Sequence, residues 1–195
     1  MTTMVMNNKR EMREKMTSSI AMVLTLVSLS MLFATLMLGY VAYRFTSDVW
    51  PPLGMERAAL ELPTLSTVII LVSSLTYYLT ETSFLSQKLK QFKVFFSLTF
   101  LLGVGFMISQ MFLWKNLEAT GIYVDTTVFG SIIYAFTWIH AAHVIGGIVA
   151  LLFLIPSLTG KRDYLKGQIW VKNVGQYWHF LGIVWFILYF SIFIF

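Results

Sequence analysis

The sequence contains no cysteine among its 195 residues, and only 12% of those residues are charged. Without cysteine there are no disulfide bonds, thiolate nucleophiles, iron–sulfur clusters or cysteine-ligated copper. The glycine-rich phosphate-binding and nucleophile-elbow patterns of common soluble enzymes are also missing. Apolar residues, in contrast, make up 57% of the chain, and the mean hydropathy is +0.75. This composition lies outside the range of soluble globular domains and predicts an integral membrane protein.

Five long intervals carry no charged residue, and each is long enough to cross a bilayer, which takes about 20 apolar residues. They run from Met16 to Tyr43, Leu62 to Thr80, Val94 to Trp114, Thr126 to Gly160 and Asn173 to Phe195. None alternates like a barrel strand, so helices are the spanning structure that satisfies the backbone. We therefore predict an all-α integral membrane protein, a bundle of five transmembrane helices in a single membrane domain over residues 1–195. The expected helices are residues 18–43, 62–81, 94–114, 127–156 and 174–195.

Positive charge is distributed unequally between the two sets of connectors. The N-terminus with the second and fourth connectors holds eleven basic residues: Lys9, Arg10, Arg13, Lys15, Lys88, Lys90, Lys93, Lys161, Arg162, Lys166 and Lys172. The opposite set holds only Arg44, Arg57 and Lys115. Cytoplasmic loops carry the excess of Lys and Arg, so we expect a cytoplasmic N-terminus and an external C-terminus. Basic residues spread over short loops at a membrane surface favour membrane lipids, and not nucleic acid, as their partner.

Small residues recur on the fourth predicted span, where Ala142, Gly146 and Ala150 follow one another at spacing four beside Gly147. Such a stripe lets another helix approach closely within lipid. We therefore expect the fourth span to be central to the packing. Polar side chains expected to hydrogen-bond across helices are Ser73, Ser74, Thr76, Ser109 and Gln110.

Three histidines are the candidates for chemistry within the spans. His140 and His143 lie at i and i+3 on the fourth span, and His179 lies near the predicted start of the fifth. Three imidazoles on neighbouring helices could ligate haem or copper, and an autonomous haem-b membrane protein is one alternative. Two histidines on one helix cannot by themselves sandwich a haem, and no carboxylate completes a metal site. We predict no metal ligand and no catalytic residue in this chain, the histidines bridging helices instead. A small transporter subunit, the other alternative, would need broken helices, inverted repeats or midplane charges.

Aromatic residues mark the remaining candidates. Trp178, Trp185 and Tyr189 form a stripe at helical spacing, typical of bundle core or lipid contact. Trp50 and Arg57, in the longest connector, are expected with Trp178 and His179 near a membrane surface, where a ring or cation anchors a lipid headgroup. The lipid or helix-packing candidates are therefore Trp50, Arg57, His140, His143, Gly146, Gly147, Trp178, His179 and Trp185.

Four stretches of the sequence resemble subunit III of the haem-copper cytochrome c and quinol oxidases. The segment YWHFLGIVW at Tyr177–Trp185 resembles the family's YWHFxDxVW signature. HAAHVIGG at His140–Gly147 resembles HGxHVxxG, preceded by FGS at Phe129–Ser131, which is similar to YGS. WPPLGM at Trp50–Met55 resembles WPPxGI, and LPTLST at Leu62–Thr67 followed by LVSS at Leu71–Ser74 resembles PLLNT and LLxSS.

The resemblance implies a short, five-helix member of this family in a bacterial inner (plasma) membrane. In that family the haems and copper lie in subunits I and II, and subunit III binds no metal. The implied roles are to pack against subunit I in a complex with subunit II, to hold structural phospholipid, and to support oxygen access, proton uptake and turnover stability. His140 and His143 are then interior hydrogen-bonding residues. We expect their replacement by Leu to weaken retention of the subunit more than it changes haem spectra.

Three departures from the family pattern each remove a carboxylate from the membrane interior. Around Leu29, Ser30 and Met31 there is no counterpart of the family's buried first-helix Glu. Gly182 stands where the signature has Asp, and Leu113 where the family often has Glu. We therefore expect this chain to contribute through packing and lipid and not through ionisable groups of its own.

Overall fold

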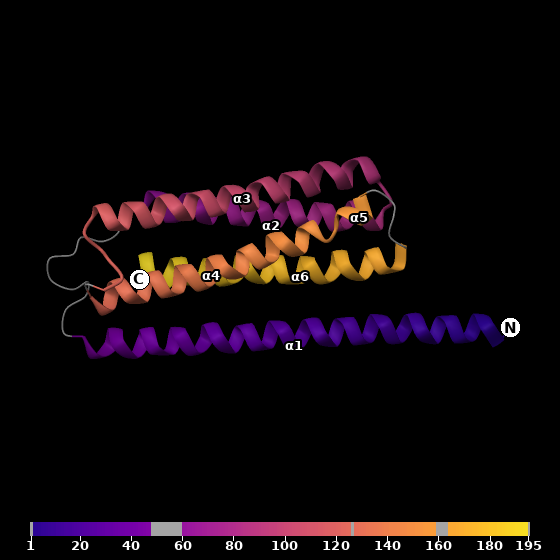
Figure 1. Cartoon of the computed structure of the whole chain (residues 1–195), viewed down its shortest axis with the longest axis horizontal. Helices are drawn as coiled ribbons and strands as arrows, with labels where there is room; N and C mark the ends of the chain where they lie inside the picture. The colour runs from indigo at the N-terminus through magenta and orange to yellow at the C-terminus, as the bar shows by residue number, and fades with distance from the viewer. Residues whose placement is uncertain (1, 48–59, 126, 159–163, 195) are drawn as a thin grey trace.

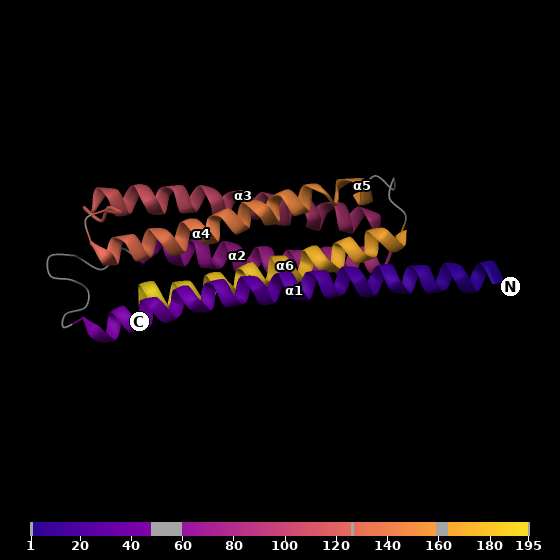
Figure 2. The same ribbon diagram turned by 60° about the horizontal axis from the view of Figure 1, so that its bottom comes forward.

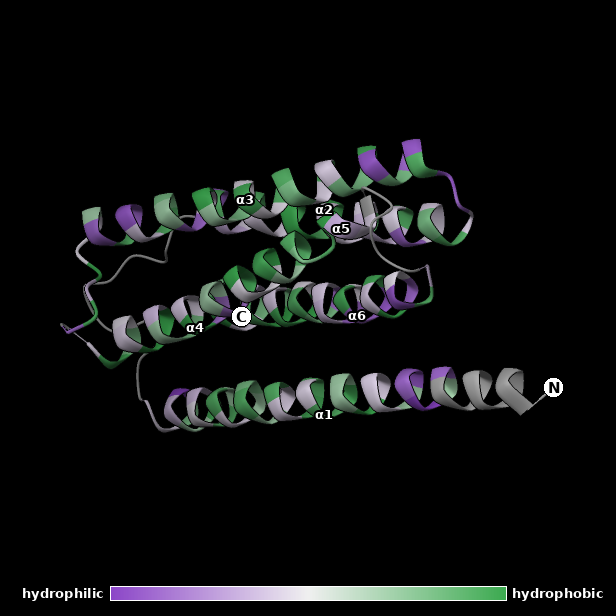
Figure 3. Ribbon diagram, turned by 45° about the vertical axis from the view of Figure 1, so that its right-hand side comes forward, coloured by the Kyte–Doolittle hydropathy of each residue, from purple (hydrophilic) through white to green (hydrophobic). Residues whose placement is uncertain are grey.

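The computed structural model describes residues 2–47, 60–125, 127–158 and 164–194. Five helices in these residues are long and apolar enough to cross a membrane, which confirms the predicted all-α class and the five apolar helices. The elements are α1 (Thr2–Thr46), α2 (Glu61–Leu85), α3 (Leu89–Ala119), α4 (Val128–Leu152), the short α5 (Ile155–Leu158), α6 (Tyr164–Tyr189) and the π-helical segment η1 (Phe190–Ile194). Apolar residues cover the middle of the helices and polar residues gather toward their ends (Figure 3).

The helices are longer than the charge-free intervals that predicted them, except that the fourth expected helix is interrupted. A helix continues through polar residues once it has left the hydrocarbon, so α1 and α3 extend beyond both predicted ends, and α6 begins ten residues before the predicted 174. The helix expected over 127–156 is interrupted near its end, because α4 ends at Leu152 and α5 begins at Ile155. Pro156 explains the break: a proline ring clashes with the carbonyl four residues earlier, here that of Leu152, and lacks the N–H that would bond it.

The hairpin of α2 and α3 is the most extensive helix pair in the fold. Its turn is closed by hydrogen bonds from the Lys88 N–H to the Ser83 carbonyl, 2.9 Å, and from the Gln87 N–H to the Phe84 carbonyl, 3.0 Å. This is the Schellman arrangement, which places the residue after the helix in the left-handed region. Gln87 takes that conformation with φ 56°. The chain therefore reverses within a few residues and sets α3 antiparallel to α2.

The helices form two layers with one helix outside them. In two views, α2 and α3 lie together, α4 and α6 form a second layer, and α1 runs along the outer side of that layer (Figures 1 and 2). Helix α6 contacts α1, α2 and α4, and α4 contacts α3 and α6 and, through the rings of Phe33 and Tyr40, also α1. The fourth span, which we expected to be central, therefore shares that place with α6. The two largest fully buried side chains, Trp178 and Trp185, belong to α6.

Helix α1 is attached to the rest of the bundle at few points. Of its eighteen most apolar consecutive residues, 6% are buried, against 33–44% in the other spans. Near one end the Asn173 side-chain amide donates a hydrogen bond to Ser18 Oγ, 2.7 Å. Near the other end the Tyr40 hydroxyl donates to the Ser191 carbonyl, 2.5 Å. Between them, the Phe33 ring meets the His143 ring edge-on at 5.6 Å.

We expect the double variant Tyr40→Phe/Asn173→Leu to loosen α1 while the other four spans stay packed. Each interhelical hydrogen bond within a membrane contributes about 0.6 to 2 kcal/mol, so losing both removes much of the specific attachment of α1. The absence of cysteine allows a clean measurement by disulfide cross-linking between introduced Ala21→Cys and Val174→Cys. The double variant should slow cross-linking severalfold, whereas Tyr78→Phe, at an exposed tyrosine of α2, should not. Equal rates in both would show that these bonds do not hold α1.

Candidate functional site

The centre of the bundle is the indole of Trp178, which four helices share. The side chain is 0% exposed, and its ring lies between two glycines on α3 and α4. A Cβ atom built on Gly103 would lie 2.8 Å from the ring, and one built on Gly147 would lie 3.0 Å from it. The indole N–H donates a hydrogen bond to Ser73 Oγ of α2, 3.1 Å. Trp178 is therefore a helix-packing residue, one of the two roles predicted for it, and it does not lie at a lipid headgroup.

A second buried indole, that of Trp185, lies two turns further along α6. Its N–H donates to Thr67 Oγ1 of α2, 3.0 Å. Its ring meets Phe106 of α3 edge-on, with ring centroids 5.0 Å apart, and His140 of α4 at 5.3 Å. Trp185 thus also contacts three helices. Aromatic pairs in these geometries add about 0.5–1.5 kcal/mol to the burial of their surface.

His140 is fully buried in a cage of aromatic rings. Phe33, Phe106 and Trp185 surround it, from three different helices. Both of its ring nitrogens are buried and have no hydrogen-bond partner among the residues that the structure describes. The expectation that His140 is an interior hydrogen-bonding residue is therefore wrong. The neighbouring spans present ring faces and edges at this position instead of hydroxyls.

The other two histidines are held by different partners. His143 Nδ1 donates to the Ile139 carbonyl of its own helix, 2.6 Å, and the His143 carbonyl accepts a bond from the Tyr177 hydroxyl, 3.0 Å. His179 Nδ1 is hydrogen-bonded to Ser74 Oγ of α2, 2.5 Å. Because α6 begins at Tyr164, His179 lies well inside the helix and not near its start. Ser74 therefore supplies the polar partner of His179 in a chain where the signature carboxylate is Gly182.

Smaller polar groups fasten α2 to its neighbours, as predicted for five of them. Ser66 and Ser109 share a hydrogen bond of 2.8 Å, and the Gln110 amide donates to Ser66 Oγ, 3.1 Å. Thr76 and Thr99 share another, of 2.9 Å. With Ser73 and Ser74 described above, each of the five polar residues expected to bond across helices does so. The partners Ser66 and Thr99 were not predicted, because the sequence does not tell whether a serine or threonine lies on an interior face or on a lipid face of its helix.

The small-residue stripe of α4 divides into two faces. Gly147 is buried against Leu181 and Trp178 of α6. Gly146 is exposed, and the nearest atom to a Cβ built on it would be the Tyr177 hydroxyl at 3.5 Å. The close helix approach therefore occurs at Gly147, one residue away from the predicted stripe. Two further candidates, Trp50 and Arg57, lie outside the described residues.

The three imidazoles are not assembled into one site. His140 lies in its aromatic cage and His179 is bonded to Ser74. In the part of the chain that the structure describes, no group of three His, Cys, Asp or Glu side chains could hold a metal ion. The autonomous haem-b alternative therefore gains no support from the geometry. The histidines and their partners instead hold neighbouring helices together.

The contrast between His140 and His179 gives a direct test. We expect His140→Leu to leave the subunit as stable as before or to raise its stability by about 1 kcal/mol, because an unpartnered buried polar group is replaced by an apolar one of similar size. His179→Leu should lower stability by a similar amount, because it removes the bond to Ser74. Thermal unfolding of the two variants in one detergent measures the difference. This reverses the sequence-based expectation for His140, and a destabilised His140→Leu would restore it.

Comparison with known proteins identifies the chain. The family model described as "Cytochrome c oxidase subunit III" matches residues 5–195. This chain belongs to the cytochrome c oxidase subunit III family. It is 30% identical over 178 residues to the "Probable cytochrome c oxidase subunit 3" of Nocardia farcinica, covering 90% of this chain and 86% of the relative. It is 29% identical to the protein of that name from Mycobacterium tuberculosis strain H37Rv, over 88% and 84%. It is 27% identical to "Cytochrome c oxidase subunit 3" of a Synechocystis species, over 88% and 73%.

Membership of the cytochrome c oxidase subunit III family fixes the general setting of the site. The chain is a multi-pass membrane protein with bacterial homologues. As subunit III it is part of the cytochrome c oxidase complex, which implies other oxidase subunits, and the family carries no metal centre. The interhelical core around Trp178 and Trp185 is thus the internal framework of a subunit, built on the segments that carry the family resemblance.

Proposed function

We propose that this chain is the non-redox subunit that packs against catalytic subunit I of a terminal oxidase in a bacterial plasma membrane. Subunit II belongs to the same complex, and the haems and copper lie in those two partners. In this role the chain stabilises the enzyme during turnover, holds structural phospholipid, and supports the passage of oxygen through lipid and the uptake of protons. It contributes no catalytic centre of its own.

The observation that carries this proposal is how the spans use their polar side chains. Trp178, Trp185 and His179 each bond a hydroxyl of α2, so these polar groups join helices to one another. The exposed large side chains of the spans are mostly apolar, on α1 above all. Such a bundle is suited to fill space within a membrane complex. A transporter would need polar groups along a path or broken helices at the midplane.

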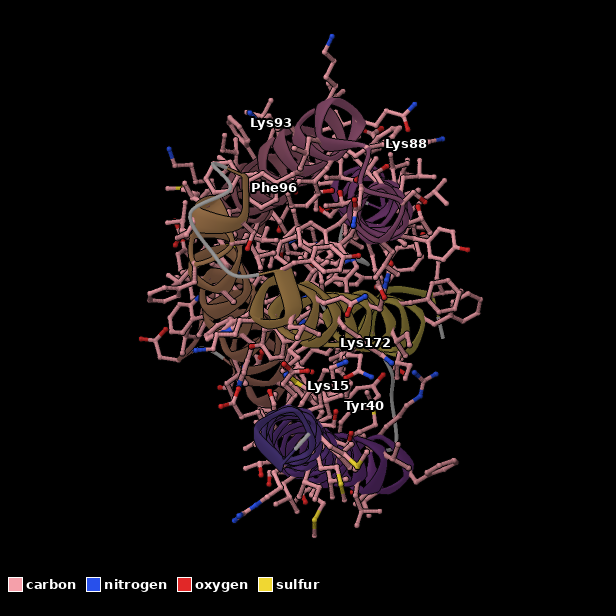
Figure 4. All side chains as sticks on the ribbon, turned by 90° about the vertical axis from the view of Figure 1, so that its right-hand side faces the viewer. Lys15, Tyr40, Lys88, Lys93, Phe96 and Lys172 are labelled. Atoms are coloured by element: carbon pink, nitrogen blue, oxygen red, sulfur yellow. The ribbon has the colours of Figure 1, made fainter. Side chains whose placement is uncertain are left out.

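A second part of the proposal is the orientation, with the N-terminus in the cytoplasm. Lys15, Lys88, Lys93 and Lys172 lie toward the end of the bundle from which Figure 4 is viewed. Lysine and arginine concentrate on the cytoplasmic side of membrane proteins. A reporter that folds only in the cytoplasm should therefore be active when fused before Thr2 and inactive when fused after Ile194.

The experiment that tests the function is purification of the tagged chain from its own membranes, with oxygen consumption and an absorption spectrum measured on the product. Two larger subunits carrying haem and copper should accompany it. Oxidase prepared without this chain should keep its spectrum and its initial rate and lose activity faster during turnover. A chain that purifies alone and colourless, or an oxidase whose lifetime in turnover is the same without it, would contradict the proposal.

A further inference from the structure

The outer side of α6 carries a row of side chains that its neighbouring helices leave open. The row follows the spacing of three and four residues that keeps side chains on one side of a helix: Lys172, Gln176, His179, Ile183 and Phe186. His179 is half-buried and the other four are exposed. The remaining sides of α6 face α1, α2 and α4. We call these five residues the outer strip of α6.

The outer strip lies between α2 and α1. Ser74 of α2 is bonded to His179 on one side, and Ser18 of α1 accepts a bond from Asn173 on the other. A view along the helices shows α6 between α2 and α1 (Figure 4). Both helices contact α6, whereas they share little contact with each other in the described part of the chain. The three helices therefore form one face with the outer strip at its middle.

Two polar side chains of the outer strip lie within the uncharged part of α6. No charged residue follows Lys172, and at 1.5 Å per residue Gln176 and His179 are about 6 and 10 Å beyond it. Nδ1 of His179 is bonded to Ser74, but its Nε2 has no partner among the described residues, and neither has the Gln176 amide. Hydrocarbon offers no hydrogen bond, so polar atoms left open to it are costly. Lipid alone is therefore a poor covering for the outer strip.

The outer side of α3 provides a contrast within the same bundle. Between Leu98 and Phe112 every exposed residue of α3 is apolar, and the polar side chains of that stretch are buried. This is the distribution that suits a surface in contact with acyl chains. Helix α6 instead places Gln176 and His179 on its open side. Its outer strip is therefore suited to contact with another protein segment.

The face is hollowed and positively charged at the Lys172 end of the outer strip. A cavity of about 310 Å³ there is lined by residues of α1, α2 and α6, among them Lys15, Glu81 and Lys172. Two ammonium groups against one carboxylate leave one net positive charge. An acidic side chain of a partner complements that charge and fixes the register in which the partner lies on the face.

We infer that the face formed by α1, α6 and α2 receives a transmembrane helix of another oxidase subunit. The docked helix is apolar where it meets Ile183, carries a hydroxyl, amide or carboxyl group beside His179, and has an acidic side chain near Lys172. Lying between α1 and α2, it gives α1 a packing partner that the rest of the chain provides at few points. This inference rests on the proposed function, because it names the surface through which the subunit joins the complex.

The test is photo-cross-linking in the purified, intact complex. A benzoylphenylalanine incorporated in place of Ile183 should cross-link predominantly to another subunit, within a membrane span that mass spectrometry identifies. The matched control is the same substitution at Leu101 of α3, because the two residues are exposed to nearly the same extent, 60% and 64%. The control should cross-link to lipid and detergent. Predominant cross-linking of position 183 to lipid, or to a second copy of this chain, would overturn the inference.

A second measurement tests the polar contact itself. Gln176→Leu should weaken the binding of the detergent-purified subunit to the rest of the oxidase about three- to twentyfold, the equivalent of one interhelical hydrogen bond in a membrane. The thermal unfolding of the subunit should stay the same, because Gln176 has no hydrogen bond within the described residues. Gln91→Leu, at an exposed glutamine of α3, is the matched control and should change neither quantity. Equal binding of the two variants would contradict a contact at the outer strip.

The docking face and the proposed function fail in different ways. An active oxidase with haem-bearing partners in which position 183 cross-links only to lipid refutes the docking face and leaves the proposed function intact. A chain that purifies without oxidase partners refutes the proposed function itself.

Discussion

Gly103→Leu should destabilise this subunit strongly, and Gly105→Leu, two residues away on the same helix, should not. A Cβ at Gly103 would lie 2.8 Å from the Trp178 indole, whereas nothing lies within 4 Å of a Cβ at Gly105. The indole cannot move away, because Gly147 contacts its other side and its N–H is bonded to Ser73. Overpacking of this kind costs about 1–3 kcal/mol, and Leu at Gly103 should be at the upper end of that range.

The pair is well matched, because both substitutions change the helix propensity of α3 equally. The measurement is the temperature at which the subunit leaves the purified complex, followed by size-exclusion chromatography after heating. Gly103→Leu should lower that temperature clearly below the value for Gly105→Leu. If the two variants dissociate at the same temperature, the close seating of Trp178 does not hold the bundle together.

Trp185→Ala should have the second large effect, through loss of contacts at the junction of α2, α3 and α4. Truncating a fully buried Trp typically costs about 3–5 kcal/mol. Here the change removes the ring contacts with Phe106 and His140 and the bond to Thr67. The control is Trp138→Ala, at a tryptophan of α4 that is 49% exposed. We expect the control to cost less than half as much, in the same dissociation assay.

The absorption spectrum of the Trp185→Ala complex also tests whether Trp185 acts through packing or on the redox centres. The absorption spectrum of any complex that still assembles should be unchanged, because the contacts of Trp185 described above are all internal to the bundle. Altered haem bands in an assembled Trp185→Ala complex, with normal thermal stability, would argue that this residue acts on the catalytic subunit and not on its own helices.

The sequence was sufficient for the number and class of the helices, because uncharged stretches near 20 residues long have one structural solution in lipid. The ends of the helices were less predictable. Polar residues such as those before Asn173 continue a helix into the headgroup region, and Pro156 breaks one inside an uncharged interval. Charge alone therefore marks the part of a helix inside the hydrocarbon, and not the whole helix.

The sequence predicted many of the residues that form the site but not the contacts between them. Tryptophan, glycine and hydroxyl residues of the core were recognised, but which of them meet depends on interhelical contacts that one sequence does not contain. Gly103 carried no signal, since a glycine in a span can face lipid, as Gly39 does, as easily as an indole. For His140 the sequence suggested a contact that does not form. A polar residue within a span was expected to make a hydrogen bond, but aromatic rings surround this side chain in the structure.

The sparse attachment of α1 has a consequence for biosynthesis. Ser18 and its partner Asn173 are 155 residues apart, which a ribosome adding about 5–20 residues per second covers in roughly 8–30 seconds. During that time α1 lacks the hydrogen bonds that it later shares with Asn173 and Ser191, because these residues follow the other described spans in the chain. The hydroxyls of Thr25, Ser28, Ser30 and Thr35 bond carbonyls four residues earlier in the same helix. Helix α1 therefore satisfies these hydroxyls within itself, and it gains its hydrogen bonds to the α6 end of the bundle only after that segment has been made.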